Sequence, residues 1–393
     1  MQQQIAAEEA TDLNSFRGLS SAILLGVVGP EVFIVQPGFV QGLVQKVGFT
    51  EQGAGYTASV EMFGIAATTV VLTFFANRLD WRKLLYVSLL LMFAANVASA
   101  YVHDLNAFAV LRFFAGLGAG TLITISFTAV GLTRKVDRNF GLLIMWVLLY
   151  GAFGLLVMPA AFEAVGMAGV LWFFALFPLL AMAVVRYIPR SGSTVTEIRE
   201  DAVELSVPLK SAALLSMFVY FLGQGVVWAY LFLIGVNAGL TEQQVANGLM
   251  LSQFAGVAGA FGAAWLAHRT HHALALIVGI VGGAVVLYPL VGHFGSLMYA
   301  LVVSVYNLAW NFTQPVLLGA MARFDRRGLV VVYAVAAQMC GLAFGPGLAA
   351  MVIGEGNLSP VIWLGLVLFF FSLALILPPV WAQARRAQGV VVT

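Results

Sequence analysis

The chain has 393 residues, of which 61% are hydrophobic and 9% are charged, and its mean hydropathy is +0.97. Soluble globular proteins carry about 25% charged residues, so this composition excludes a soluble domain and indicates an integral membrane protein. The net charge of +2 is not concentrated in a basic soluble domain, which excludes a nucleic-acid-binding function. The single cysteine, Cys340, excludes an intrachain disulfide and a cysteine metal cluster.

Twelve apolar runs are long enough to cross a membrane, since a spanning helix needs about 20 apolar residues. They lie at 19–43, 54–76, 84–102, 106–132, 139–161, 169–187, 210–236, 244–267, 273–292, 296–321, 329–353 and 359–381. Membrane β-barrel strands are instead alternating segments of about ten residues. We therefore predict an all-α membrane protein with twelve transmembrane helices.

The polar stretch 188–209 divides these runs into an N-terminal half, 1–187, and a C-terminal half, 210–393, with six runs each. Halves of this kind are typical of transporters built from a repeat, whose substrate site lies at the repeat interface near the bilayer midplane. We expect 188–209 to be a cytoplasmic linker, in which Thr196–Leu205 could form a short amphipathic helix on the membrane surface.

Lys and Arg predict the orientation, because cytoplasmic loops are enriched in them. With the N-terminus inside, 17 of the 19 Lys and Arg residues fall on the cytoplasmic side, Lys46 falls outside and Arg112 lies within a run. We expect both termini in the cytoplasm and a multi-pass monomer in the plasma (inner) membrane.

Four short stretches carry a family resemblance. Asp80, Arg82 and Lys83 lie in the loop after the second run, and Arg112 precedes spaced glycines in the fourth. The eleventh run contains GLAFGPG at 341–347, and the loop 267–272 stands where a second copy of the first loop motif would lie, without its acid. In these features, and over nearly its whole length, the chain resembles the major facilitator superfamily. The resemblance implies a secondary transporter.

The eleventh-run motif resembles the Gly-x-x-x-Gly-Pro motif of the drug:proton antiporter branch of that family. In the family this motif belongs to the fifth segment, where the chain has Gly151, Gly154 and Pro159 in a different spacing. At the loop motif, Asp80 could form a gate with Arg82 and Lys83 whose charge pairs break on inward opening. The alternative is that Arg82 and Lys83 only set topology.

Three ionisable residues are embedded in the runs: Glu31, Glu61 and Arg112. At 1.5 Å per residue, Glu61 and Arg112 lie roughly 10 Å from the outer end of their runs and Glu31 roughly 18 Å. An intramembrane charge is by default a functional group. Arg112 can pair with one carboxylate and leave the other able to bind and release a proton. We predict that these three couple transport to protons; a cation site, an anion site on Arg112 and a purely structural pair are the alternatives.

Embedded polar residues of the second half carry no charge. We expect substrate contacts from Gln36 in the first run and from a second-half set consisting of Gln224, Trp228, Asn307, Trp310 and Asn311. Hydrogen bonding between helices is the structural alternative. A metal site at His268, His271 and His272 is disfavoured because no acid is near in the sequence, and no phosphate-binding loop or cofactor motif is present.

The sequence therefore favours a proton-coupled transporter that moves a small organic molecule by alternating access. Export is favoured by the embedded acids, the aromatic-rich runs and the Gly-Pro motif, whereas import of an organic, for example aromatic, anion would fit Arg112. A membrane-embedded enzyme using Glu31 and Glu61 as acid and base lacks a nucleophile or a metal constellation. A sensor without transport is the third class.

Overall fold

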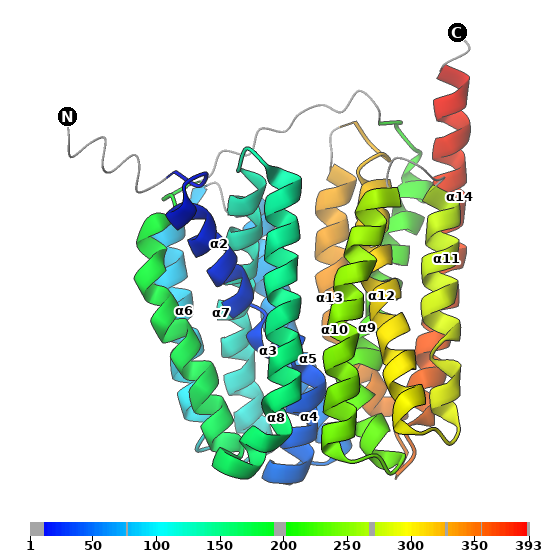
Figure 1. The fold of residues 1–393 in the computed structure, drawn as a ribbon. Helices are drawn as coiled ribbons and strands as arrows, with labels where there is room; N and C mark the ends of the chain where they lie inside the picture. Colours follow the sequence, from blue (N-terminus) through cyan, green and yellow to red (C-terminus); the bar gives the residue numbers. More distant parts are fainter. Residues whose placement is uncertain are drawn as a thin grey trace, which may run out of the picture. The chain divides into compact units, whose positions relative to one another are not determined.

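The computed structural model describes residues 12–75, 78–191, 202–266, 272–326, 329–354 and 356–390. The chain divides into two compact units, Met1–Thr194 and Val195–Thr393, and the regular secondary structure of the described residues is helical (Figure 1). Within those residues, nine helices are long and apolar enough to cross a membrane on their own. The remaining three crossings come from a second arm of one of these helices, from a broken helix at 16–42 and from the more polar α12 (Ser296–Met321). The fold is an all-α membrane fold with twelve transmembrane passes in two six-helix halves.

The first unit contains α2 (Phe16–Val28), α3 (Glu31–Ile34), α4 (Gln36–Gly42), the π-helical η1 (Leu43–Val47), α5 (Glu51–Phe75), α6 (Trp81–Ser99), α7 (Leu105–Gly131), α8 (Val136–Ala181) and the 3-10 helix η3 (Met182–Tyr187). At 1.5 Å per residue, the 46 residues of α8 are about twice as long as the hydrocarbon core is thick. Gly166 has a φ of 65°, which glycine adopts without strain, and the helix doubles back there (Figure 1). Its two arms form the fifth and sixth passes.

The first pass is not the single continuous helix expected over 19–43. It breaks between Val28 and Glu31 and again at Val35, whose φ is −101°. Pro30 and Pro37 lie at the two breaks, and proline both lacks a backbone N–H and clashes with the carbonyl four residues earlier. Glu31 is therefore the first residue after a break in a transmembrane helix.

Backbone-to-backbone packing holds α5 against α7. A Cβ atom added to Gly64 would lie 2.3 Å from the Phe113 carbonyl oxygen, and one added to Gly116 would lie 2.1 Å from the Glu61 carbonyl oxygen. Small residues permit such an approach between transmembrane helices. The approach brings Glu61 on α5 within reach of Arg112 on α7.

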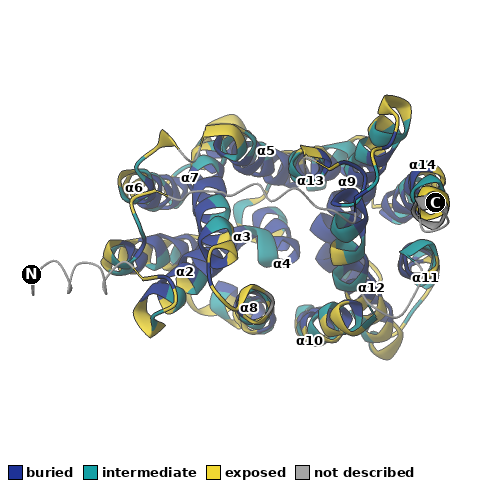
Figure 2. Cartoon of the chain, turned by 90° about the horizontal axis from the view of Figure 1, so that it is seen from above, coloured by how far each residue is buried: buried dark blue, intermediate teal, exposed yellow. Residues whose placement is uncertain are grey.

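The second unit contains α9 (Val207–Asn237), α10 (Glu242–Leu266), α11 (His272–Val285), the 3-10 helix η4 (Tyr288–Val291), α12 (Ser296–Met321), α13 (Leu329–Val352) and α14 (Ser359–Val390). Helix α9 is the most buried of them, as its dark blue ribbon in Figure 2 shows, and it packs on α13 and α14. A Cβ atom on Gly345 would lie 2.5 Å from the Cα atom of Gly225, so α9 and α13 also touch through their backbones.

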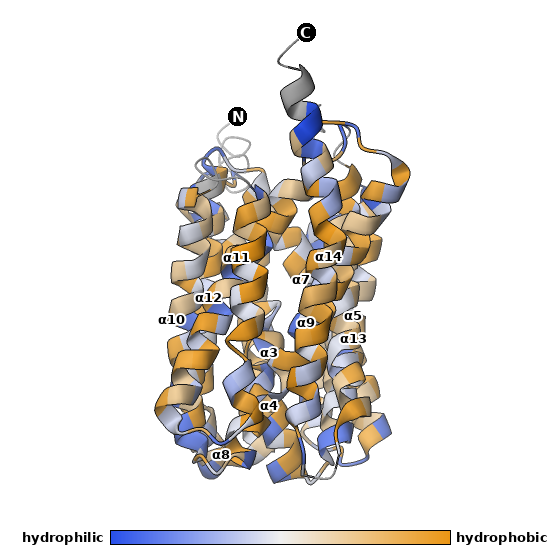
Figure 3. Ribbon diagram, turned by 90° about the vertical axis from the view of Figure 1, so that its right-hand side faces the viewer, coloured by the Kyte–Doolittle hydropathy of each residue, from blue (hydrophilic) through white to orange (hydrophobic). Residues whose placement is uncertain are grey.

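Large apolar side chains lie exposed along many of the helices, for example Phe74 and Phe173 in the first unit and Phe261 and Trp265 in the second. Figure 3 shows this apolar covering on α11 and α14, with hydrophilic residues towards the end of α14. Soluble proteins rarely expose so much contiguous apolar surface. These faces contact lipid.

The predicted amphipathic helix at Thr196–Leu205 is not formed in the part that the structure describes. Its first residues, 196–201, lie outside the described residues, and 202–205 are not helical. The Val203 and Leu205 N–H groups donate to the carbonyl oxygens of Arg323, at 3.0 Å, and Phe324, at 3.1 Å. This pairing takes up backbone groups that a helix would have bonded internally.

Candidate functional site

Arg112 and Glu61 form a bidentate ion pair inside the first unit. Arg112 Nη2 lies 2.6 Å from Glu61 Oε1, and Arg112 Nε donates to Glu61 Oε2 at 3.1 Å. Both side chains are buried, with exposed fractions of 1% for Arg112 and 5% for Glu61. Charge-assisted, bidentate bonds of this kind are strong and fix both groups in place.

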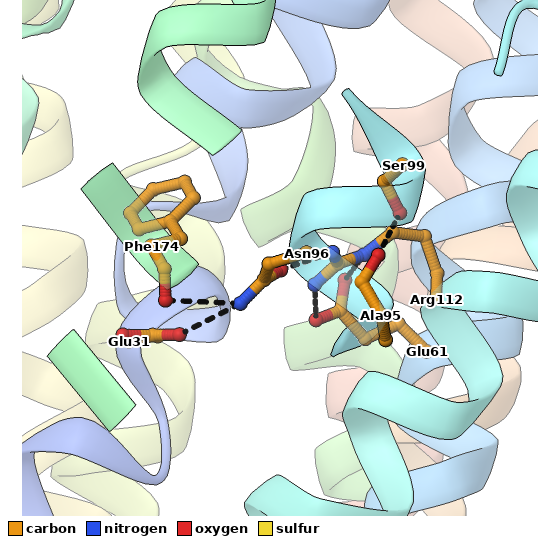
Figure 4. A network of polar contacts seen from close by, with 7 residues as sticks. All are labelled: Glu31, Glu61, Ala95, Asn96, Ser99, Arg112 and Phe174. Carbon is orange, nitrogen blue, oxygen red and sulfur yellow. Dashed lines mark hydrogen bonds and ion pairs between the residues drawn. The ribbon is translucent and has the colours of Figure 1, made fainter. Parts of the chain in front are cut away.

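Asn96 of α6 connects this pair to Glu31 (Figure 4). Its Oδ1 accepts from Arg112 Nη1 at 2.5 Å, and its Nδ2 donates to Glu31 Oε1 at 3.3 Å and to the Phe174 carbonyl oxygen at 3.0 Å. Asn96 is fully buried, with an exposed fraction of 0%. The network therefore draws on α3, α5, α6, α7 and the second arm of α8.

Glu31 differs from Glu61 in its partners. Its exposed fraction is 1%, and its Oε2 atom has no hydrogen-bond partner among the described residues. A cavity of about 10 Å³, close to the space of one water molecule, is lined by Glu31, Glu61, Asn96 and Arg112 among others. Since Arg112 also lies over the Phe39 ring, 5.4 Å from its centroid, its guanidinium is enclosed by protein groups. Glu31 is thus the carboxyl group with acceptor capacity to spare.

In the second unit, Gln224 is bonded to a member of an aromatic cluster. Trp228 and Trp310 meet edge to face with 5.7 Å between ring centroids, and Tyr306 lies 6.2 Å from Trp310. The Tyr306 hydroxyl donates to Gln224 Oε1. These residues come from the facing sides of α9 and α12, so the structure brings three of the predicted substrate residues together.

Asn307 and Asn311 lie on a different side of α12. Asn311 Nδ2 donates to Asn307 Oδ1 at 2.8 Å, and Asn307 Nδ2 donates to Ser252 Oγ of α10 at 3.3 Å. The structure therefore places the two amides against α10, away from the hydrogen bond that joins Gln224 to Tyr306. Gln36 belongs to the first unit, where its buried Oε1 has no hydrogen-bond partner among the described residues.

Asp80, at the predicted gate, is the N-cap of α6. Its Oδ1 accepts from the backbone N–H groups of Arg82, at 3.0 Å, and Lys83, at 3.2 Å. The Arg82 Nε donates to the Ile188 carbonyl oxygen at 2.6 Å and so ties the start of α6 to the residue after η3. Ala76 and Asn77 of the same loop lie outside the described residues.

No cluster of three metal-binding side chains occurs among the described residues. His268 and His271 of the histidine stretch lie outside them, and His272 begins α11.

Two residues at the centre of these clusters, Asn96 and Tyr306, are not among those predicted from the sequence. Asn96 is the only amide in its run, and nothing in the sequence connects it to Arg112 sixteen residues later. Tyr306 could have been found, because it precedes Trp310 by four residues, as Gln224 precedes Trp228, and such pairs share a helix face.

The sequence profile of the Major Facilitator Superfamily matches residues 22–324 of the chain. The chain belongs to this superfamily. No curated protein sequence matches it. The protein is accordingly a multi-pass membrane transporter of the major facilitator superfamily and not an enzyme.

Several solved transporter structures share this fold. A D-xylose-proton symporter aligns with a TM-score of 0.72 and 18% identity over 91% of this chain and 97% of its own. The inward-open xylose transporter XylE from E. coli gives 0.71 and 16% over 90% and 94%, respectively. A point mutant of the nucleoside transporter NupG gives 0.68 and 14% over 93% and 98%. Identities this low show the shared fold alone.

Proposed function

We propose that this superfamily member is a proton-coupled secondary transporter and that Glu31 is the group that binds the transported proton. The supporting observation is the unpartnered Oε2 of a buried carboxyl group at a break in a transmembrane helix. Broken helices at the midplane form ion and substrate sites in transporters. A carboxyl group can be a neutral acid or a carboxylate, so Glu31 can alternate between two states during a cycle.

Glu61 has the complementary role in this proposal. Both of its oxygens accept from Arg112, and a guanidinium does not lose its proton in a protein. Asn96 joins this pair to Glu31 through two of its hydrogen bonds. Because the Arg112 donors already face Glu61 and Asn96, import of an organic anion bound at Arg112 is less well supported than transport of a neutral molecule.

The proposed substrate is a small neutral organic molecule with hydrogen-bonding groups and one flat apolar face. Trp228, Trp310 and Tyr306 would offer ring surfaces, and Gln224, whose Oε1 accepts from Tyr306, would offer its NH2 group. The sugar and the nucleosides after which the similar transporters are named have both properties. Asn307, Asn311 and Gln36 are the remaining proposed contacts.

For the direction of transport, the sequence favoured export through its embedded acids, its aromatic-rich runs and the Gly-Pro motif. The glycines of that motif have a packing role here, since a Cβ atom on Gly341 would lie 2.4 Å from the Phe218 carbonyl oxygen of α9. With the motif explained by packing, and with a proton symporter among the similar structures, we propose symport, and export by antiport is the alternative.

The proposal is tested by Glu31→Gln, which keeps the size of the side chain but fixes the neutral state. A thermal-shift screen of sugars and nucleosides on the purified protein first supplies the ligand. In proteoliposomes, Glu31→Gln should still exchange this ligand but should lose accumulation driven by a pH gradient, because no proton can be released from residue 31. Glu163→Gln is the matched control, since it makes the same change at an exposed position of α8.

Retention of full gradient-driven accumulation by Glu31→Gln would overturn the assignment. If Glu61→Gln then abolished accumulation, the two carboxylates would have exchanged roles. If both variants kept it, a group other than these two carboxylates would bind the proton. If the unmodified protein showed no accumulation in a pH gradient, coupling to sodium or uniport would replace the proposal. The sign of the gradient that drives accumulation separates symport from antiport in the same vesicles.

A further inference from the structure

The Phe174 carbonyl group has an unusual partner for a residue inside a helix. In an α-helix this oxygen would accept from the N–H group four residues later, which here is residue 178. Residue 178 is a proline inside α8, and proline has no N–H. The carbonyl oxygen is therefore available to Asn96 Nδ2, which lies 3.0 Å away.

This bond and the bond from Arg112 together fix the orientation of the Asn96 amide. Arg112 can only donate, so the group that faces its Nη1 must be Oδ1; a carbonyl oxygen can only accept, so the group that faces Phe174 must be Nδ2. Both contacts require the same orientation. In that orientation the second N–H of Nδ2 points to Glu31 Oε1, at 3.3 Å.

We infer that Pro178 is a positioning residue for proton coupling: by leaving the Phe174 carbonyl without a helical donor, it holds the Asn96 amide with an N–H directed at Glu31. The inference rests on the proposed function of Glu31. A hydrogen bond donated to a carboxylate favours its charged form. Pro178 therefore affects, through Asn96, how readily Glu31 takes up a proton.

The charged and titratable groups around Glu31 come from three other elements. Arg112 of α7 and Glu61 of α5 act on it electrostatically, as does Tyr150 from the first arm of α8. Replacing Pro178 removes none of these groups. A change in the pH dependence of transport after Pro178 is replaced would thus reflect a change in the hydrogen bond from the Asn96 amide to Glu31.

The test is Pro178→Ala, which restores a backbone N–H that competes with Asn96 for the Phe174 carbonyl. The pH midpoint of uptake into proteoliposomes is measured with the sugar or nucleoside that stabilises the unmodified protein in the thermal-shift screen. It should move to higher pH by about 0.5–1 unit, the size expected from losing one hydrogen bond to the carboxylate. Pro159→Ala is the matched control, because Pro159 is also a buried proline inside α8, and it should leave the midpoint unchanged. Pro178→Val supplies the same N–H with a different side chain and should act like Pro178→Ala.

A double-variant cycle shows whether Pro178 acts through Asn96. Asn96→Ala and the double variant Asn96→Ala/Pro178→Ala should have the same midpoint, whereas independent effects would add. Additive shifts, an unchanged midpoint in Pro178→Ala, or an equal shift in Pro159→Ala would overturn the inference. Failure of the proposed function is seen separately, as full gradient-driven accumulation by Glu31→Gln.

Discussion

Glu31 and Glu61 are both buried carboxyl groups, yet their partners differ. Glu61 accepts two hydrogen bonds from one guanidinium, whereas Glu31 accepts one from an amide and keeps Oε2 without a partner among the described residues. Removal of one member of a buried ion pair is costly because the other charge stays buried. The pair should therefore matter for stability, and Glu31 for coupling.

Arg112→Ala should destabilise the protein by about 3–5 kcal/mol, since it leaves the Glu61 carboxylate buried without its cation. Adding Glu61→Gln should recover much of this loss, because a neutral amide replaces the stranded charge. Thermal unfolding of the detergent-purified variants measures both changes. Normal stability and transport in Arg112→Ala alone would contradict the proposed network, and Glu163→Gln again serves as the control.

At the scale of elements, glycine contacts set the distance between helices that carry site residues. Gly64 and Gly116 let α5 and α7 touch, and Gly225 and Gly345 do the same for α9 and α13. Gly141 of α8 is different, because a Cβ atom there would have open space around it. Packing of α7 against α5 thus requires a glycine at residue 116, whereas no neighbouring group requires one at residue 141.

Gly116→Ala should lower the free energy of unfolding by about 1–3 kcal/mol, as overpacking in a close contact usually does. Its Cβ atom would lie 2.1 Å from a backbone oxygen that cannot move independently. Gly141→Ala should be neutral or stabilising by up to about 1 kcal/mol, because alanine favours the helix. Equal unfolding temperatures for the two variants would show that the α5–α7 contact tolerates a methyl group.

The start of α6 allows the gate hypothesis to be separated from helix capping. Asparagine caps helices about as well as aspartate, whereas alanine costs about 1 kcal/mol. Asp80→Asn should thus keep the stability of the protein but shift cysteine labelling on the cytoplasmic side towards the inward-open state. Asp80→Ala should show the same shift and a lower unfolding temperature.

The labelling is measured in a Cys340→Ala background that carries single introduced cysteines. Unchanged labelling and transport in Asp80→Asn would leave Asp80 as a helix cap only.

At the scale of the whole molecule, the two units have different interiors. The first buries a charged network, and the described part of the second combines aromatic rings with uncharged amides around α9 and α12. In a superfamily that works by alternating access, this division fits coupling in one half and substrate contact in the other.

The distribution of Lys and Arg predicts that both termini and the linker lie in the cytoplasm. A reporter enzyme that is active only outside the cytoplasm should be inactive when fused at the C-terminus or within 192–201. The same reporter inserted next to Lys46, on the expected outer side, should be active. Activity at the C-terminus or in the linker would contradict the predicted orientation.

The sequence by itself determined the membrane class, the approximate passes and the three embedded ionisable residues. These properties are local: a pass needs an apolar run of sufficient length, and a charge within it can be read directly. The observed bounds of α12, Ser296–Met321, are those predicted for the tenth run.

Only the tertiary structure decided which carboxylate Arg112 binds, because Glu31 and Glu61 are equally suitable partners by charge. The choice depends on how closely α5 and α7 approach, and that distance is set by glycines on both helices. The same holds for Asn96, whose partners lie 16 to 78 residues away in the chain. Hydrogen bonds between residues so far apart in the chain depend on how the helices pack together. The residue pattern within one helix does not show which groups of the other helices will face that helix.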